Sequence, residues 1–439
     1  MNLLKDNVKK IYFRYLLAAF GSSLISTIYG FVDTIVIGKY EGPIGSSAMA
    51  VIAPIWNIIF SLGLLLGIGG SVYFSNIKAN TNKTEDENEY FTIAIIGAII
   101  LSVLCIFLFI TFEDRILYLF GANSEILPLC KEYLLPIKFV IPTYIFTQIL
   151  AAFLRNDNDP ALATKAVLFG GIFNVFGDIY FVFGLKLGMF GAGLATAIGN
   201  TISLLTMCAH FFSNMNSLHF VKVNHMFIKA KNIITTGFSS FFVDVAMGIV
   251  TALINNQIMN YMNSNALAVY SIIVNISTCV QCCGYSVGQA SQPIISANLG
   301  ARQHNRIHET FKYATIASFG FSLVWVALTM LFPTQIVSLL MKATEEVLQI
   351  TPHIIRLYSL SFILLPFNVF TTYYFQSIMK PSIAFAISLA RGAIISGILI
   401  MILPSIIGET GIWIAMPITE LIVFFIAIYN IKKTYNLSN

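Results

Sequence analysis

Two carboxylic acids, Asp33 and Asp178, lie inside long apolar stretches of this 439-residue sequence. An ionised side chain surrounded by hydrocarbon is costly, so acids in such positions usually bind an ion, a proton or a charged ligand. Two neighbouring carboxylates cannot both stay ionised without a counter-ion, and a hard cation such as Na⁺ prefers oxygen ligands. The pair therefore predicts an ion-coupling site that holds either a proton or Na⁺.

Two further polar residues are spaced so that they can join these acids. Asn174 stands four residues before Asp178, so both side chains project from one face of a helix. Thr196 reaches the same depth from the start of the next apolar stretch, and its hydroxyl can bridge a carboxylate or coordinate a small cation. The alternative for all four residues is a structural one, because Asn and Thr often hold membrane helices together by hydrogen bonds.

The elements that position these residues follow from composition. With 57% hydrophobic and only 10% charged residues, the sequence is typical of an all-α polytopic membrane protein. Each crossing needs about 20 apolar residues. That window predicts about twelve spans, at 11–38, 47–76, 90–112, 132–153, 161–184, 187–213, 231–260, 265–297, 309–335, 346–378, 382–406 and 409–430.

Basic residues predict the orientation of these spans. About 17 Lys and Arg lie near the span ends on the side of the termini and about 7 on the other, while Arg391 alone lies within a span. We therefore expect a multi-pass protein of the plasma (inner) membrane with both termini in the cytoplasm. Its basic residues report orientation, and no nucleic-acid partner is expected.

The sequence also contains an imperfect repeat with a displacement of about 220 residues. The matching segments, in order, are 47–51 with 265–269, Gly63 and Gly67 with Gly284 and Gly288, and Gly191 and Ala195 with Gly411 and Ala415. Six spans in each half make the repeats parallel, related by a pseudo-two-fold axis along the membrane normal. We predict an N-terminal lobe at 1–215, a cytoplasmic linker at 216–230 and a C-terminal lobe at 231–439.

The second half carries its own charges within predicted spans, namely Asp244, Arg391 and Glu420. Glu420 occupies the repeat position of Asn200, which lies one turn beyond Thr196. These groups either bind a cationic substrate or form a structural salt bridge, because buried charges normally pair. The repeat mates Asn57 and Asn275 are further candidates for substrate contact, with core hydrogen bonding as the alternative.

Three motifs carry a resemblance to a known family. Residues 32–38 (Val-Asp-Thr-x3-Gly), residues 174–196 and the segment 288–301 resemble those of multidrug and toxic compound extrusion (MATE) transporters. The resemblance implies a V-shaped, two-lobe antiporter that exports organic cations in exchange for H⁺ or Na⁺. It places the coupling ion at Asp33, Asn174, Asp178 and Thr196. Asp244 is similar to a glutamate of one branch of the family, but that branch's acid in the tenth span is missing here.

The predicted function is therefore a secondary active multidrug antiporter that works by alternating access, as a monomer in the lipid bilayer, with cationic amphipathic substrates. We expect no cofactor and no enzymatic activity. One alternative is a flippase for lipids or lipid-linked precursors, which would carry more spans and a cationic cavity, whereas only Arg391 lies deep here. The other is a membrane enzyme or sensor, for which the sequence offers no nucleophile-base pair, metal motif or nucleotide-binding loop.

Overall fold

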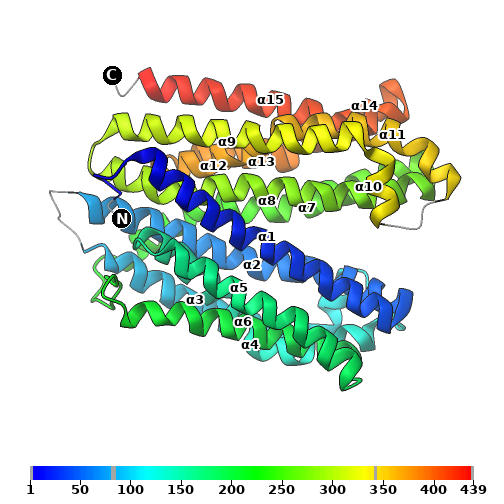
Figure 1. Ribbon diagram of the computed structural model, residues 1–439, viewed down its shortest axis with the longest axis horizontal. Coiled ribbons are helices and arrows are strands. Elements are labelled where there is room, and N and C mark those ends of the chain that lie inside the picture. The colour runs from blue at the N-terminus through cyan, green and yellow to red at the C-terminus, as the bar shows by residue number, and fades with distance from the viewer. Residues whose placement is uncertain (1–2, 81–85, 341–343, 437–439) are drawn as a thin grey trace. The chain divides into compact units, whose positions relative to one another are not determined.

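The helices follow the predicted apolar stretches closely. The computed structural model describes residues 3–80, 86–340 and 344–436, and over these residues it contains helices and no strand (Figure 1). The elements of the first half are α1 (Val8–Tyr40), α2 (Gly42–Ala79), α3 (Asn88–Leu119), α4 (Leu127–Asn156), α5 (Pro160–Asp178), the π-helix η1 (Ile179–Gly184), α6 (Gly188–Cys208) and the 3₁₀ turn η2 (Ala209–Phe212).

The second half has more breaks along its helices. Its elements are α7 (Met226–Tyr261), α8 (Ser264–Gly300), α9 (His304–Leu331), α10 (Pro333–Leu340), α11 (Glu345–Ser359), the 3₁₀ turn η3 (Leu360–Ile363), α12 (Leu365–Ser377), α13 (Pro381–Leu389), the π-helix η4 (Ala390–Ile394), α14 (Ile395–Ile407) and α15 (Glu409–Asn436). The predicted ninth span is divided, because α9 ends just before Pro333 and a short separate helix follows.

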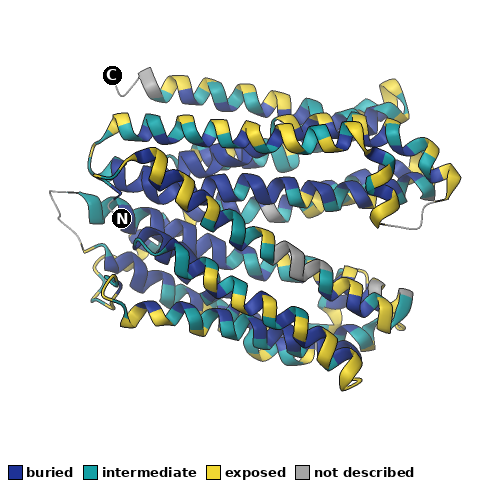
Figure 2. Cartoon of the chain, in the orientation of Figure 1, coloured by how far each residue is buried: buried dark blue, intermediate teal, exposed yellow. Residues whose placement is uncertain are grey.

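Eleven helical segments of the described chain are long and apolar enough to cross a membrane, and α1 is a further long helix over the predicted first span. The surface of these segments is apolar as well. On α3, for example, Ile99, Ile100, Val103 and Phe107 are each more than half exposed, and Figure 2 shows exposed residues along many of the helices. Apolar surface of this kind faces lipid, so the predicted class of all-α polytopic membrane protein is confirmed.

The chain divides into two compact units. Unit 1 comprises Met1–Phe241 with Pro293–Ile307, and unit 2 comprises Phe242–Gln292 with His308–Asn439. In unit 1, α5 packs on α6 and α1, and α4 packs on α2 and α6. In unit 2, α15 packs against α14, α11 and α12. The lobe boundaries expected from the sequence stay a prediction.

Close helix contacts explain the repeated glycines. A Cβ atom added to Gly63 of α2 would lie 2.7 Å from Cβ of Gln148 on α4, and one added to Gly284 of α8 would lie 2.9 Å from Cβ of Val369 on α12. Gln148 and Val369 are 221 positions apart, as are Gly63 and Gly284. Each unit therefore has a glycine at the same position of the repeat, and this glycine lets an equivalent pair of helices pack closely.

Candidate functional site

The site in unit 1 is built where α5 gives way to a π-helix. The Asp159 side chain caps α5 by accepting a hydrogen bond from the Leu162 amide at 3.2 Å. At the other end, Asp178 is the last residue of α5 and η1 begins directly after it. Short π-helical turns of this kind are frequent at functional sites, because they change the direction of the side chains around them.

The structure brings the predicted residues of this site into one buried cluster. Asn174 Nδ2 donates to Thr196 Oγ1 at 3.0 Å, and Asp33 and Asp178 lie close enough to interact electrostatically. Asp33, Asn174, Asp178 and Thr196 are exposed by 5%, 3%, 0% and 8%. The sequence did not reveal Tyr133 of α4, whose hydroxyl donates to Asp33 Oδ2 at 2.6 Å.

Four oxygen atoms in this cluster have no hydrogen-bond partner among the described residues. They are Asp33 Oδ1, Asn174 Oδ1 and both carboxylate oxygens of Asp178. A buried carboxylate without a partner is strongly destabilised, so the cluster needs a proton or a cation to be stable. Because all of these free atoms are oxygens, they suit a hard cation such as Na⁺ as well as a proton. The residues present therefore fit either coupling ion.

The structure also places the remaining predicted polar residues. Asn200 Nδ2 donates to Thr143 Oγ1 at 2.7 Å, and Asn200 lines a small cavity beside Asn174. Asn57 is exposed on α2. In unit 2, Asn275 is half-buried on α8, while the side chain of Asp244 lies outside the part of the chain that the structure describes.

The charges of unit 2 form a buried ion pair. Arg391 Nε donates to Glu420 Oε1 at 2.7 Å, and Asn368 Nδ2 donates to Glu420 Oε2 at 2.6 Å. Glu420 is 0% exposed, and Arg391 lines a cavity of about 50 Å³ beside Tyr270 and Tyr358. Both oxygens of Glu420 are therefore satisfied, in contrast to those of Asp178. No sequence pattern pointed to the contribution from Asn368.

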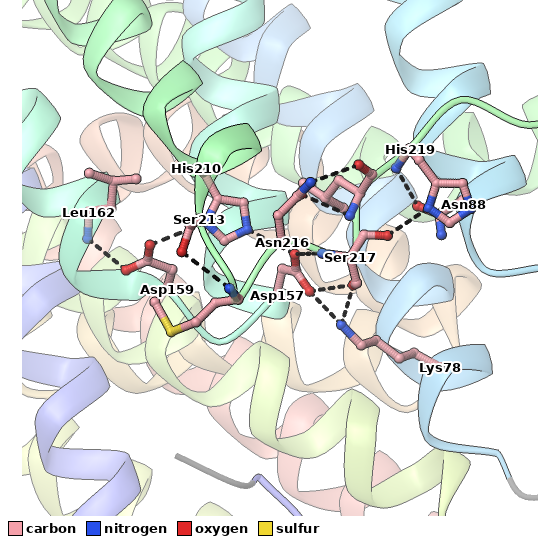
Figure 3. A network of polar contacts seen from close by, with 12 residues as sticks. Lys78, Asn88, Asp157, Asp159, Leu162, His210, Ser213, Asn216, Ser217 and His219 are labelled. Atoms are coloured by element: carbon pink, nitrogen blue, oxygen red, sulfur yellow. Dashed lines mark hydrogen bonds and ion pairs between the residues drawn. The ribbon is translucent and has the colours of Figure 1, made fainter.

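A third polar cluster joins the loop between α4 and α5 to the chain that follows α6 (Figure 3). Asp157 is fully buried and binds Lys78 Nζ, His210 Nε2 at 2.8 Å, and both the amide and hydroxyl of Ser217 at 2.8 and 2.5 Å. His210 Nδ1 lies 3.2 Å from Asp159 Oδ2. Because both ring nitrogens face carboxylates, His210 is placed to donate from both as an imidazolium.

These contacts stabilise the charged forms of both acids. Burial alone would raise the pKa of Asp157, but the hydrogen bond from His210 and the charge of Lys78 offset it and leave that pKa below its usual value. The hydrogen bond from His210 also lowers the pKa of Asp159. Since the folded-state pKa values are depressed, the stability they contribute is present above the normal carboxyl pKa and is lost as the pH falls below it.

Asp157→Asn should lower the stability of the protein by about 2–4 kcal/mol, because it leaves buried donors facing a neutral amide. Thermal unfolding of the purified protein in detergent measures this as a fall in Tm. The matched control is Asp114→Asn, which removes a half-exposed carboxylate from its surface ion pair with Lys131 and should change stability by less than about 1 kcal/mol. Equal Tm values for the two variants would contradict a structural role for Asp157.

Both halves of the chain match the model of one protein family. Residues 18–180 match the MatE family model, and residues 240–403 match it as well. This chain belongs to the MatE family. The two matched segments lie in the two halves of the MATE chain, in line with the repeat in its sequence. The resemblance carried by the sequence motifs is thereby confirmed.

Relatives of this MATE protein cover nearly its whole length. The multidrug export protein MepA of Staphylococcus aureus (strain MSSA476) is 25% identical over 421 residues, which is 95% of this chain and 92% of MepA. An outward-facing multidrug resistance MATE family transporter of the MOP superfamily has the same fold, with a TM-score of 0.92, 20% identity and coverage of 100% and 98%. The MATE multidrug transporter DinF-BH, solved in complex with a ligand, has a TM-score of 0.89 and 25% identity. The match covers 99% of this chain and 98% of DinF-BH.

Proposed function

We propose that this MATE protein is a multidrug efflux transporter that exports cationic amphipathic compounds from the cell. The proposal is supported by relatives named as multidrug export proteins, which align with 95% of the chain. It is also supported by DinF-BH, a multidrug transporter of the same fold whose structure holds a bound ligand. Transport is the activity of this family, and the chain acts as a transporter and not as an enzyme.

Export is driven by an ion gradient through the cluster at Asp33, Asn174, Asp178 and Thr196. The observation that carries this proposal is the set of four buried oxygens without hydrogen-bond partners, since a site built this way changes free energy strongly when H⁺ or Na⁺ binds. An ion that binds one conformation better than another shifts their populations, and this shift drives alternating access. The ion thereby enters as the substrate leaves.

The remaining predicted residues serve the substrate or the charge balance of the bundle. Arg391 and Glu420 form the charge network of unit 2, and the other members of this set are Asp244, Asn57, Asn275 and Asn200. Positively charged residues near the span ends support an inner-membrane protein with both termini in the cytoplasm. The transporter acts as a monomer surrounded by lipid.

One assay tests the proposal and identifies the ion. The protein is reconstituted in proteoliposomes, and flux of ethidium is measured with a pH gradient and a Na⁺ gradient imposed separately. One of the two gradients should drive accumulation, and an ionophore that dissipates it should return the flux to the passive level. If neither gradient drives flux of ethidium or of other organic cations, the antiport proposal is wrong.

A further inference from the structure

A small polar cavity lies inside unit 1 next to the acid cluster. It has a volume of about 30 Å³ and is bounded by α4, α5 and α6. Asn174 and Thr196 form its boundary with the acid cluster. Away from them it extends to Val167 on α5 and Ser203 on α6, which lie further along the bundle in the direction opposite to Asp178.

The cavity has the size and chemistry to hold water. A water molecule needs roughly 10–15 Å³ of such volume and two to four polar partners, so this space takes about two waters. Its lining includes Asn174, which is 3% exposed and whose Oδ1 has no partner among the described residues. Thr147 and Ser203 are also buried in the lining. Their hydroxyls donate to the carbonyl oxygens of Thr143 and Gly199, so the hydroxyl oxygens are left to accept from water. A buried amide oxygen without a protein partner, on a residue that lines a polar cavity, favours a bound water there.

Helix backbone forms one wall of this space. A Cβ atom added to Gly199 of α6 would lie 2.7 Å from the carbonyl oxygen of Gly170 on α5, so the two helices touch through their backbones beside the cavity. Both glycines line the cavity together with Gly171. Because this wall is made of helix backbone, side-chain rearrangement cannot fill the space from that side.

The cavity extends from the acid cluster toward the polar network shown in Figure 3. At a rise of about 1.5 Å per residue, Val167 lies about 16 Å along α5 from Asp178, and Asp159 lies about 12 Å further on. Ser203 lies about 10 Å along α6 from His210. Between the cavity and this network the helices are closed by small or apolar residues, since Ala163, Ala166 and Met207 are at most 1% exposed.

We propose that this cavity is the first part of an internal ion route, in which bound waters pass the coupling ion between the acid cluster and the end of unit 1 that carries Asp157, Asp159 and His210. The route runs between α4, α5 and α6 within one unit. Met207, Ala163 and Ala166 form its closed segment. This proposal rests on the proposed antiport function, since it assigns a path to the same ion. Ser203 acts as a positioning residue for the waters.

Filling the cavity tests the route. Ser203→Val adds apolar volume and removes a hydroxyl, so it displaces water and should slow gradient-driven ethidium flux by about tenfold. Equilibrium binding of ethidium to the detergent-solubilised protein should stay within about twofold, because the role proposed for Ser203 is to position waters and not to contact substrate. Ser203→Ala removes the hydroxyl but leaves space for water, and its flux should exceed that of Ser203→Val by at least about fivefold. Thr201→Val, on α6 but outside the cavity, is the matched control and should transport normally.

The outcomes separate this proposal from the antiport function. Without gradient-driven flux in the unmodified protein, the antiport function itself fails. The water route is wrong if Ser203→Val shows the same gradient-driven ethidium flux as the unmodified protein. It is also wrong if the flux of Ser203→Ala is as low as that of Ser203→Val. Should Ser203→Val not fold, Ser203→Cys in a background without native cysteines provides a second measurement. Ag⁺, which is close to Na⁺ in size, should then inhibit transport by that variant only, and absence of inhibition would overturn the route.

Discussion

Asp178→Asn should reduce gradient-driven export by about 100-fold, which is near the upper end of the coupling factors found between linked sites. The substitution keeps the shape of the side chain but removes the carboxylate that has no hydrogen-bond partner on either oxygen among the described residues. A neutral amide at this position needs neither a proton nor a cation, so ion binding no longer changes the free energy of the cluster. The initial rate of ethidium uptake into proteoliposomes under the driving gradient measures the effect.

Two controls make this result specific to coupling. Downhill ethidium flux without an ion gradient should persist in Asp178→Asn, because that flux reports substrate passage without ion entry. Asp114→Asn neutralises a half-exposed acid in a surface ion pair, and should leave driven flux unchanged. Driven export by Asp178→Asn at the normal rate would exclude this cluster as the coupling site.

Local spacing accounts for part of the geometry of the cluster. Asn174 and Asp178 are four residues apart, and helix geometry alone places them on one face. The hydrogen bond between Asn174 and Thr196 joins consecutive helices, whose pairing follows from a short connection. Tyr133 was missed because it is 100 positions away from Asp33. A tyrosine in an apolar span carries no sequence signal that distinguishes packing from hydrogen bonding.

The spans were predicted well because the bilayer imposes one rule on all of them, which is a long apolar helix. The polar end of unit 1 follows no such rule. Asp157 lies in a turn and contacts Lys78, His210 and Ser217, which come from other parts of the chain. Contacts of this kind depend on how helix ends meet, and the residue types of a turn do not specify their partners.

The same limit applies to Arg391 and Glu420, which the sequence left open as either substrate contacts or a salt bridge. Their hydrogen bond at 2.7 Å shows that they pair, and Asn368 completes the coordination of Glu420. The counter-ion of Glu420 is thus the guanidinium of Arg391. Pairing alone does not exclude a role in transport, because an ion pair that lines a cavity can still meet a substrate.

Glu420→Gln should therefore destabilise the protein by about 3–5 kcal/mol, since it leaves the Arg391 charge buried without its counter-ion. The combined replacement Arg391→Met with Glu420→Met should recover most of that loss, because apolar residues of similar volume often replace a buried ion pair at little cost. Thermal unfolding in detergent measures both effects, and equal destabilisation of the two variants would contradict a pair whose role is charge balance. Ethidium transport by the double variant then separates the two roles. Normal flux identifies the pair as structural, whereas loss of flux in a stable protein identifies its charges as part of the substrate path.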